Sequence, residues 1–167
     1  MLHKDYTFGG YNALIKLKEF IMNLKNMYME FSHLSEYLKS LSLLIARLLV
    51  AYGFYEPAMM KWKDINSVAE WFGSMGIPFP TLNAYMAAST EVAGVVLLTL
   101  GLLTRVISLP LIVIMIVAIV TVHLGNGFSA GNNGFEIPLY YMSFLLIFLS
   151  NGAGKFSLDR IIFGEKN

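Results

Sequence analysis

The sequence predicts an all-α protein, an integral membrane four-helix bundle with an N-terminal amphipathic helix and a short interfacial helix between spans 1 and 2. Of 167 residues, 56% are hydrophobic and only 14% are charged, with a mean hydropathy of +0.61. A soluble domain carries about 25% charged residues. Four apolar segments are long enough to cross a bilayer. Helices suit them because lipid cannot satisfy backbone polar groups.

The first forty residues predict an amphipathic helix. Apolar residues recur at alternating steps of three and four, broken only by Ser35, at Leu14, Leu17, Ile21, Leu24, Tyr28, Phe31 and Leu38. Acidic residues and the missing small-residue cleavage pattern argue against a secretory signal, so we expect this segment to be retained. Its spacing fits either a helix at the membrane surface or a docking helix for a second subunit.

Four spans are expected to follow, over residues 41–60, 82–103, 106–124 and 137–153. The last is the shortest, but Pro138 supports a helix start because the first turn needs no amide hydrogen at that position. The expected domains are a cytoplasmic or interfacial helix over 1–40, a four-span domain over 41–162 and a C-terminal tail over 163–167.

Both longer connections between spans carry structural signals. Apolar residues between Ile65 and Met75 fall on one helical face, which predicts a short helix on the membrane interface, ended by Gly76 and Pro78. Residues 125–136 hold four glycines and three asparagines, without Lys or Arg. Such a loop bends sharply and presents backbone amides, as a lid or a binding loop does.

The charge distribution predicts an orientation and excludes one class of function. Lys61 and Lys63 fall on one side of the spans, Arg47 lies inside a span, and the other Lys and Arg fall on the side of the termini. Both termini are therefore expected in the cytoplasm. With 12 basic and 11 acidic residues, no basic surplus exists for phosphate contacts, so we expect no nucleic-acid partner.

Ionisable residues at membrane depth are the first candidates for a functional site, because each costs about 3 kcal/mol unless it is paired or hydrated. Arg47 lies about 9 Å from the cytoplasmic start of the first span, and Glu91 lies about 18 Å from the cytoplasmic end of the second. Two long side chains can close that difference, so Arg47 and Glu91 are predicted to form a buried pair. The pair serves either the site or only the helix register.

A second polar group is predicted at the outer ends of the spans, as a pocket above that pair. Glu56, His123, Asn126 and Glu136 all fall there. Imidazole changes its protonation near physiological pH, so His123 can donate a hydrogen bond or relay a proton, or it can simply cap a helix. Glu56 and Glu136 either belong to the functional site or only lie at the membrane interface. No two of these groups show the spacing of helical metal ligands, so no metal is assigned.

The polar residues and the turns occur in a distinctive order. Arg47 precedes Lys61 by fourteen residues, Glu91 and Gly94 follow, and the turns lie at 72–80, 101–105, 123–128 and 157–159. Over about residues 41–162 this order resembles the DoxX family of small bacterial four-helix membrane proteins. The resemblance implies a multi-pass inner-membrane protein related to the DoxD subunit of thiosulfate:quinone oxidoreductase and to membrane partners of oxidative-stress and quinone-detoxification enzymes.

The chain departs from the family pattern just before the lysine. Many members carry a His-Gly pair where this chain has Pro57-Ala58, preceded by Glu56. Either Glu56 replaces that histidine or the chemistry differs.

The first functional hypothesis is a quinone-interacting component of a redox or oxidative-stress system, with oxidoreductase activity. A quinone would enter from the bilayer; His123 and Glu91 are the catalytic candidates, and the substrate-binding candidates are Arg47, Glu56, Lys61, Asn126 and Glu136. The chain has no cysteine and hence no dithiol relay. A partner redox subunit or a soluble reductant would therefore supply the electrons.

Two other hypotheses remain open. The protein is either a noncatalytic membrane scaffold that recruits a partner enzyme through its N-terminal helix and its outer loops, or a carrier for a small metabolite. A carrier of four spans offers only a narrow path unless it forms a homo-oligomer, and no inverted repeat is evident.

Overall fold

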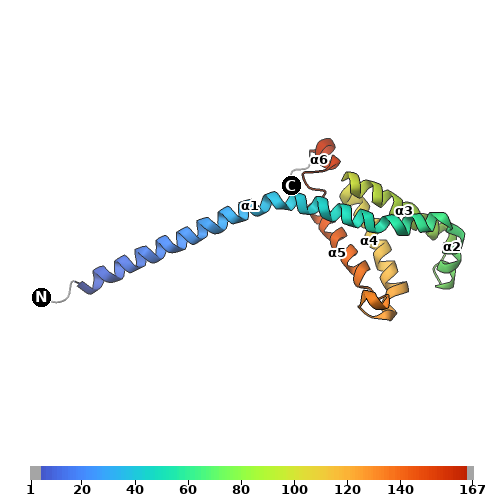
Figure 1. Ribbon diagram of the computed structural model, residues 1–167, viewed down its shortest axis with the longest axis horizontal. Coiled ribbons are helices and arrows are strands. Elements are labelled where there is room, and N and C mark those ends of the chain that lie inside the picture. Colours follow the sequence, from blue (N-terminus) through green and yellow to red (C-terminus); the bar gives the residue numbers. More distant parts are fainter. Residues whose placement is uncertain (1–4, 165–167) are drawn as a thin grey trace. The chain divides into compact units, whose positions relative to one another are not determined.

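The computed structural model describes residues 5–164, with side chains described from Asn12 onward. Its α-helices are α1 (Asp5–Lys63), α2 (Ile65–Ser74), α3 (Pro80–Leu100), α4 (Thr104–Ala118), α5 (Glu136–Asn151) and α6 (Leu158–Phe163) (Figure 1). A π-helical turn at Ile119–His123 and 3₁₀ turns at Leu124–Asn126 and Ala130–Asn132 connect α4 to α5. The described residues contain no strand, and the all-α prediction is confirmed.

The chain divides into two units, residues 1–39 and residues 40–167. In the first unit every described side chain, from Asn12 to Lys39, is exposed, including Leu14, Leu17 and Ile21 of the predicted apolar face. Residues 1–4 of the predicted N-terminal helix, and residues 165–167 of the predicted tail, lie outside the described part of the chain.

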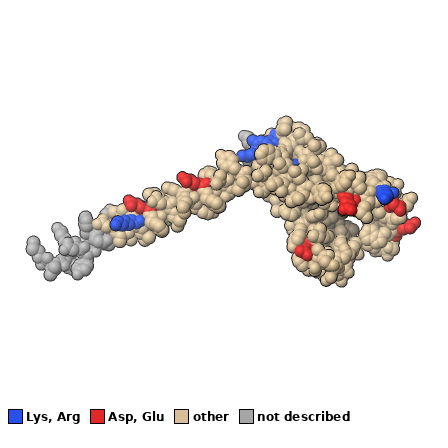
Figure 2. Space-filling model, viewed as in Figure 1, with Lys and Arg blue, Asp and Glu red and all other residues tan. Residues whose placement is uncertain are grey.

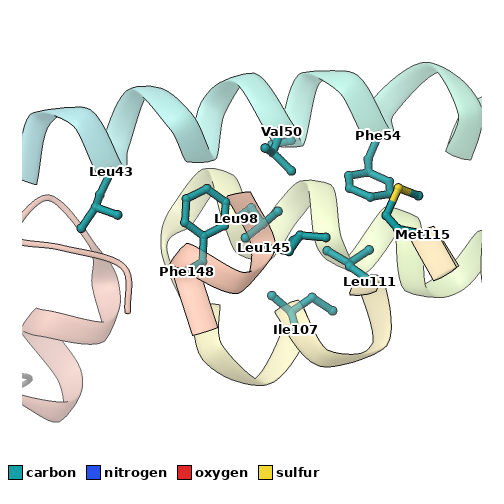
Figure 3. Packing of buried hydrophobic residues seen from close by; sticks show 10 residues of the cluster. Leu43, Val50, Phe54, Leu98, Ile107, Leu111, Met115, Leu145 and Phe148 are labelled. Carbon is teal, nitrogen blue, oxygen red and sulfur yellow. The ribbon is translucent and has the colours of Figure 1, made fainter. Parts of the chain in front are cut away.

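The second unit contains the bundle. Residues 40–63 of α1 lie along α3, α4 and α5, and α3 packs on α4, α4 on α5, and α2 on α3 (Figure 1). Figure 3 shows Phe54 of α1 beside Met115 of α4 in the core between these helices. The buried core residues are Leu43, Val50, Ala51, Phe54, Leu98, Ile107, Leu111, Met115, Leu145 and Phe148.

Within the described residues, three helical stretches have the length and apolar composition to cross a membrane, namely Asn12–Lys63, Pro80–Leu100 and Thr104–Asn126. The fourth expected span corresponds to α5, whose 16 residues extend about 24 Å. On the face shown in Figure 2, the 40–164 unit carries few charged side chains. These features fit a membrane protein in contact with the lipid bilayer.

Local backbone chemistry sets the helix ends. Pro80 occupies the first turn of α3, where its missing amide hydrogen costs nothing. The second span was expected to reach residue 103, but α3 ends at Leu100 because Gly101 and Leu103 adopt left-handed conformations with φ of 65° and 49°. The short helix predicted between the first two spans is present as α2, which the Asp64 carboxylate caps through the amide of Ser67.

Candidate functional site

Arg47 does not pair with Glu91, so that prediction was wrong. The Arg47 side chain is fully buried, and its Nη1 donates to the carbonyl oxygen of Leu98 at 2.8 Å. Its Nη2 donates to the carbonyl oxygen of Phe156 at 2.6 Å. The carbonyls at a helix C-terminus lack partners within the helix and attract a cation. Arg47 therefore stabilises the α3 terminus and the segment before α6.

Asp159 completes this arrangement from the other side of the α3–α4 turn. Its carboxylate accepts from the amides of Leu103 at 2.6 Å and Thr104 at 3.0 Å, which caps α4, and it attracts the Arg47 guanidinium. A Cβ at Gly101 would overlap Arg47 Nη1. We call Arg47, Gly101 and Asp159 the turn clamp. The turn clamp joins three of the segments that carry the family resemblance: Arg47, the turn at 101–105 and the turn at 157–159. Their contacts stabilise the fold.

Glu91 instead pairs with Lys61. The Lys61 ammonium lies 3.0 Å from Oε1 and 2.8 Å from Oε2 of Glu91. The Glu91 side chain is 3% exposed and the Lys61 side chain is 20% exposed. A buried carboxylate needs such a partner, because an unpaired charge in an apolar interior is costly.

The Lys61–Glu91 pair lies on the wall of a cavity of about 670 Å³. The cavity is lined by α1 to α5, the π-helical turn and the 130–134 segment, and its wall is mostly apolar. A hollow between α2 and the connected ends of α4 and α5 is visible in Figure 2. The polar side chains on the wall are Lys61, Asn83, Thr90, Glu91, Thr121, His123 and Asn133, with Tyr141 presenting a hydroxyl.

The π-helical turn and the glycine-rich connection position His123 on this wall. His123 Nδ1 lies 2.8 Å from the carbonyl oxygen of Asn133, and Asn126 Nδ2 donates to the same oxygen at 3.2 Å. Because a carbonyl only accepts, Nδ1 carries the hydrogen, which leaves Nε2 of the neutral ring as an acceptor. π-Helical turns within helices are frequent at functional sites.

The structure therefore places three of the predicted site residues, Lys61, Glu91 and His123, on one cavity wall, and Asn126 shares the Asn133 carbonyl with His123. Glu56 is exposed and lines a separate groove between α1 and α5. Glu136 accepts hydrogen bonds from the Ala130 amide at 2.9 Å and the Tyr140 hydroxyl at 3.0 Å, so it braces the connection. The predicted outer pocket with Glu56 and Glu136 beside His123 is wrong. In the part of the chain that is described, no three His, Asp or Glu residues form a cluster suited to a metal ion.

The aromatic wall of the cavity was not predicted. Trp71 and Phe72 reach it from α2, and Tyr141 reaches it from α5. One signal was available in the sequence, because Pro57 and Pro110 lie inside two of the helices that form the wall. A proline inside a membrane helix frees backbone groups and often marks a cavity.

The DoxX family model matches residues 42–124. An uncharacterized protein of Haemophilus influenzae is 37% identical over 125 residues, which cover 72% of this chain and 83% of that protein. The chain belongs to the DoxX family. The putative oxidoreductase CatD of Bacillus subtilis is 32% identical over 74% of this chain and 90% of its own length. The uncharacterized membrane protein Rv3486 of Mycobacterium tuberculosis is 31% identical over 71% of this chain and 80% of its own length. No solved structure gives a significant match.

The DoxX match includes Arg47 of the turn clamp, and Lys61, Glu91 and His123 of the cavity. It ends before Asn133 and Tyr141, which complete the cavity wall, and before Asp159, which completes the turn clamp. Both sites of this DoxX protein therefore combine residues from inside and outside the matched segment.

Proposed function

We propose that this DoxX protein binds a quinone in the 670 Å³ cavity and acts as the membrane component of a redox system. One observation carries the proposal. The cavity wall is mostly apolar and aromatic, but it also contains the Lys61–Glu91 ion pair and the oriented imidazole of His123. Pockets for small organic molecules measure about 300–1,000 Å³ and combine apolar walls with a few polar groups that fix orientation.

The polar groups match the needs of the two redox states of a quinone. A quinone presents two carbonyl acceptors, and the ammonium of Lys61 has three N–H donors, of which two face the Glu91 oxygens. The third is available to a ligand carbonyl. A hydroquinone presents hydroxyl donors, which suit the acceptor Nε2 of His123. Trp71 and Phe72 provide flat apolar surfaces for the ring.

Reduction of a quinone to a hydroquinone consumes two electrons and two protons. Lys61, Glu91 and His123 are the groups on the cavity wall that would exchange those protons. The chain has no cysteine pair to supply electrons, so a partner redox subunit or a soluble reductant donates them. The oxidoreductase name of the Bacillus subtilis relative supports a redox role. A link to oxidative stress is part of this proposal.

The proposed location is the bacterial inner membrane with both termini in the cytoplasm. Lys and Arg gather on the side of the termini, as cytoplasmic segments do. With this orientation the turn clamp lies near the cytoplasm, and the Lys61–Glu91 pair and His123 lie toward the outer side.

Thermal unfolding of the protein in nanodiscs tests the proposal. A benzoquinone or a naphthoquinone analogue should raise Tm of the wild type. The double variant Lys61→Met, Glu91→Gln removes both charges together, and it should lose most of that shift, as should His123→Phe. Arg47→Lys, which alters a buried charge outside the cavity, is the matched control and should keep the shift. If no quinone raises Tm of the wild type, the proposal is wrong.

A scaffold role is the second candidate, and one observation favours it. Apolar side chains are exposed along residues 12–38, among them Phe20, Tyr28 and Phe31. Purification of the full chain and of a 40–167 fragment from native membranes separates the two candidates. A scaffold should lose a specific companion protein when residues 1–39 are removed, whereas a quinone-binding component should keep its Tm response.

A further inference from the structure

A second cavity, the α1–α5 groove, lies beside the candidate quinone site. It has a volume of about 850 Å³ and is lined only by residues between Leu49 and Lys63 of α1 and by Tyr140, Tyr141 and Phe144 of α5. Residues 49 to 63 of a helix extend over about 21 Å along its axis. The groove therefore runs along the spans, in the direction in which lipid chains lie.

The groove is lined mostly by aliphatic and aromatic side chains and carries two charged residues. Leu49, Tyr52 and Phe144 are exposed on its wall. Glu56 lies at the middle of the α1 stretch that lines the groove, and Lys63 lies at the end that leads into α2. A flexible apolar chain can pack on the aliphatic side chains and the tyrosine rings of this wall, which present flat apolar surfaces.

Two residues belong to both the groove and the cavity of the candidate quinone site. Gly53 and Tyr141 line each of them, so they form the partition between the two. A Cβ at Gly53 would overlap the Tyr141 hydroxyl, which shows how closely this side chain sits on the α1 backbone. The Tyr141 ring also packs on Phe54, with ring centroids 5.6 Å apart. Tyr141 is therefore the α5 side chain that the two cavities share.

We propose that the α1–α5 groove holds the prenyl tail of the quinone whose ring occupies the cavity, with Tyr141 as the gate between them. This inference rests on the proposed function. It adds the class of quinone, a lipid-soluble molecule with a long tail, and a lateral route of entry from the bilayer. Gly53 provides the room for that route because it has no side chain, and Pro57 leaves the Gly53 carbonyl without its helical donor.

The groove is expected to guide the tail more than to increase affinity. Lipid tails are as apolar as the groove, so moving a prenyl chain from lipid into it releases little free energy. Affinity alone is therefore a poor test, and the position of the tail is the quantity to measure.

Photo-crosslinking on the full chain in nanodiscs measures that position. One probe is a prenylated benzoquinone with a diazirine at the far end of its tail, and the other carries the diazirine on its ring. The ring probe should label cavity residues such as Trp71. The tail probe should label groove residues such as Leu49 and Phe144. Excess unlabelled prenylated quinone should reduce the tail labelling, while excess phospholipid should not.

The outcomes separate the two proposals. If the ring probe labels the cavity but the tail probe labels exposed apolar positions outside the groove and the cavity, such as Val96 or Val106, the groove inference is wrong and the proposed function stands. If phospholipid competes as well as quinone, the groove is a general lipid site and the inference is again wrong. If the ring probe does not label the cavity, the proposed function fails.

Gate variants give an independent readout. Tyr141→Leu shortens the gate and should increase the rate at which prenylated quinone binds, measured by quenching of Trp71 fluorescence in a Trp62→Phe background. The same variant should leave the rate for a tailless quinone that enters from water unchanged. If Tyr141→Leu increases the binding rates of both compounds equally, or changes neither rate, Tyr141 is not a gate.

Discussion

Arg47 and Lys61 are both basic residues of α1, but their surroundings give them different roles. Arg47 donates to two backbone carbonyls and is attracted by the Asp159 carboxylate, and these groups belong to the ends of helices and to turns. Lys61 contacts one carboxylate and retains contact with a cavity. A guanidinium whose donors meet fixed carbonyls serves architecture, whereas an ammonium with a free donor beside a cavity can serve a ligand.

Replacement of Arg47 should therefore affect stability and leave ligand binding intact. Arg47→Met removes the hydrogen bonds to the carbonyls of Leu98 and Phe156 and the cation near Asp159, and we expect a loss of about 3 kcal/mol. Thermal unfolding should show the loss, while the folded fraction binds quinone with unchanged affinity. Arg105→Met, at an exposed arginine near the same turn, is the matched control. An unchanged Tm for Arg47→Met would contradict the turn clamp.

Gly53 and Tyr141 should behave as a coupled pair. Gly53→Ala places a methyl group where the Tyr141 hydroxyl lies, so we expect destabilisation by about 1–3 kcal/mol from overpacking. Tyr141→Leu removes the hydroxyl and most of the ring, so the double variant should recover at least about 1 kcal/mol relative to additive costs. A double-mutant cycle by thermal unfolding measures this coupling. Additive single effects would show that the two side chains do not compete for the same space.

At the scale of elements, α2 and the 124–135 connection build one end of the cavity. α2 contributes Trp71 and Phe72, and the connection holds His123 through the Asn133 carbonyl. Neither element has the length of a span, so both depend on caps and turns for their position. Asp64 caps α2 through the amide and the hydroxyl of Ser67, at 3.1 Å and 2.6 Å.

The Asp64 cap predicts a dependence on pH. The hydrogen bonds from Ser67 lower the pKa of Asp64 below its ordinary value of 3.8. Because the pKa of Asp64 is lower in the folded chain than in the unfolded chain, the charged cap stabilises α2 fully at a pH above the unfolded pKa. This contribution is lost as the pH falls through the lowered pKa of the folded chain. The Ser67 amide resonance in NMR spectra should stay constant at neutral pH and shift below about pH 4. Asp64→Asn keeps a capping oxygen without a charge, so its Ser67 resonance should not follow this titration. A wild-type resonance that does not change would contradict the cap.

At the scale of the molecule, the second unit contains both the turn clamp and the candidate functional site. The turn clamp lies at the end of the bundle where α3 meets α4, and the candidate quinone site involves the end where α1 meets α2. This separation lets the protein fix its helices at one end while a ligand enters at the other. The buried core joins the two ends within residues 40–164.

The second unit is expected to fold without residues 1–39. Its core, the turn clamp and the cavity all lie between Ser40 and Asp159. A 40–167 fragment should insert into membranes, keep a cooperative thermal transition and keep its Tm response to quinone, because every contact just named is retained. Full-length protein in the same nanodiscs is the reference. A fragment that aggregates or loses the quinone response would show that residues 1–39 are required for the bundle.

The sequence by itself determined the helices, because local rules are enough for them. Apolar length set the spans, and the glycine and proline after α2 predicted its end. The order of Arg47, Lys61, Glu91 and His123 also sufficed to indicate the DoxX family, and three of these four residues line the cavity.

Only the tertiary structure decided which charged groups meet. Residue counts along the spans placed Arg47 and Glu91 about 9 Å apart in depth, within reach of two long side chains. Depth does not say whether a side chain points toward the turn or toward the cavity. Arg47 extends to the carbonyls at the end of α3, and Lys61 extends to Glu91. The choice depends on which unsatisfied backbone groups and which empty volume lie nearby, and both arise only when the helices pack against one another.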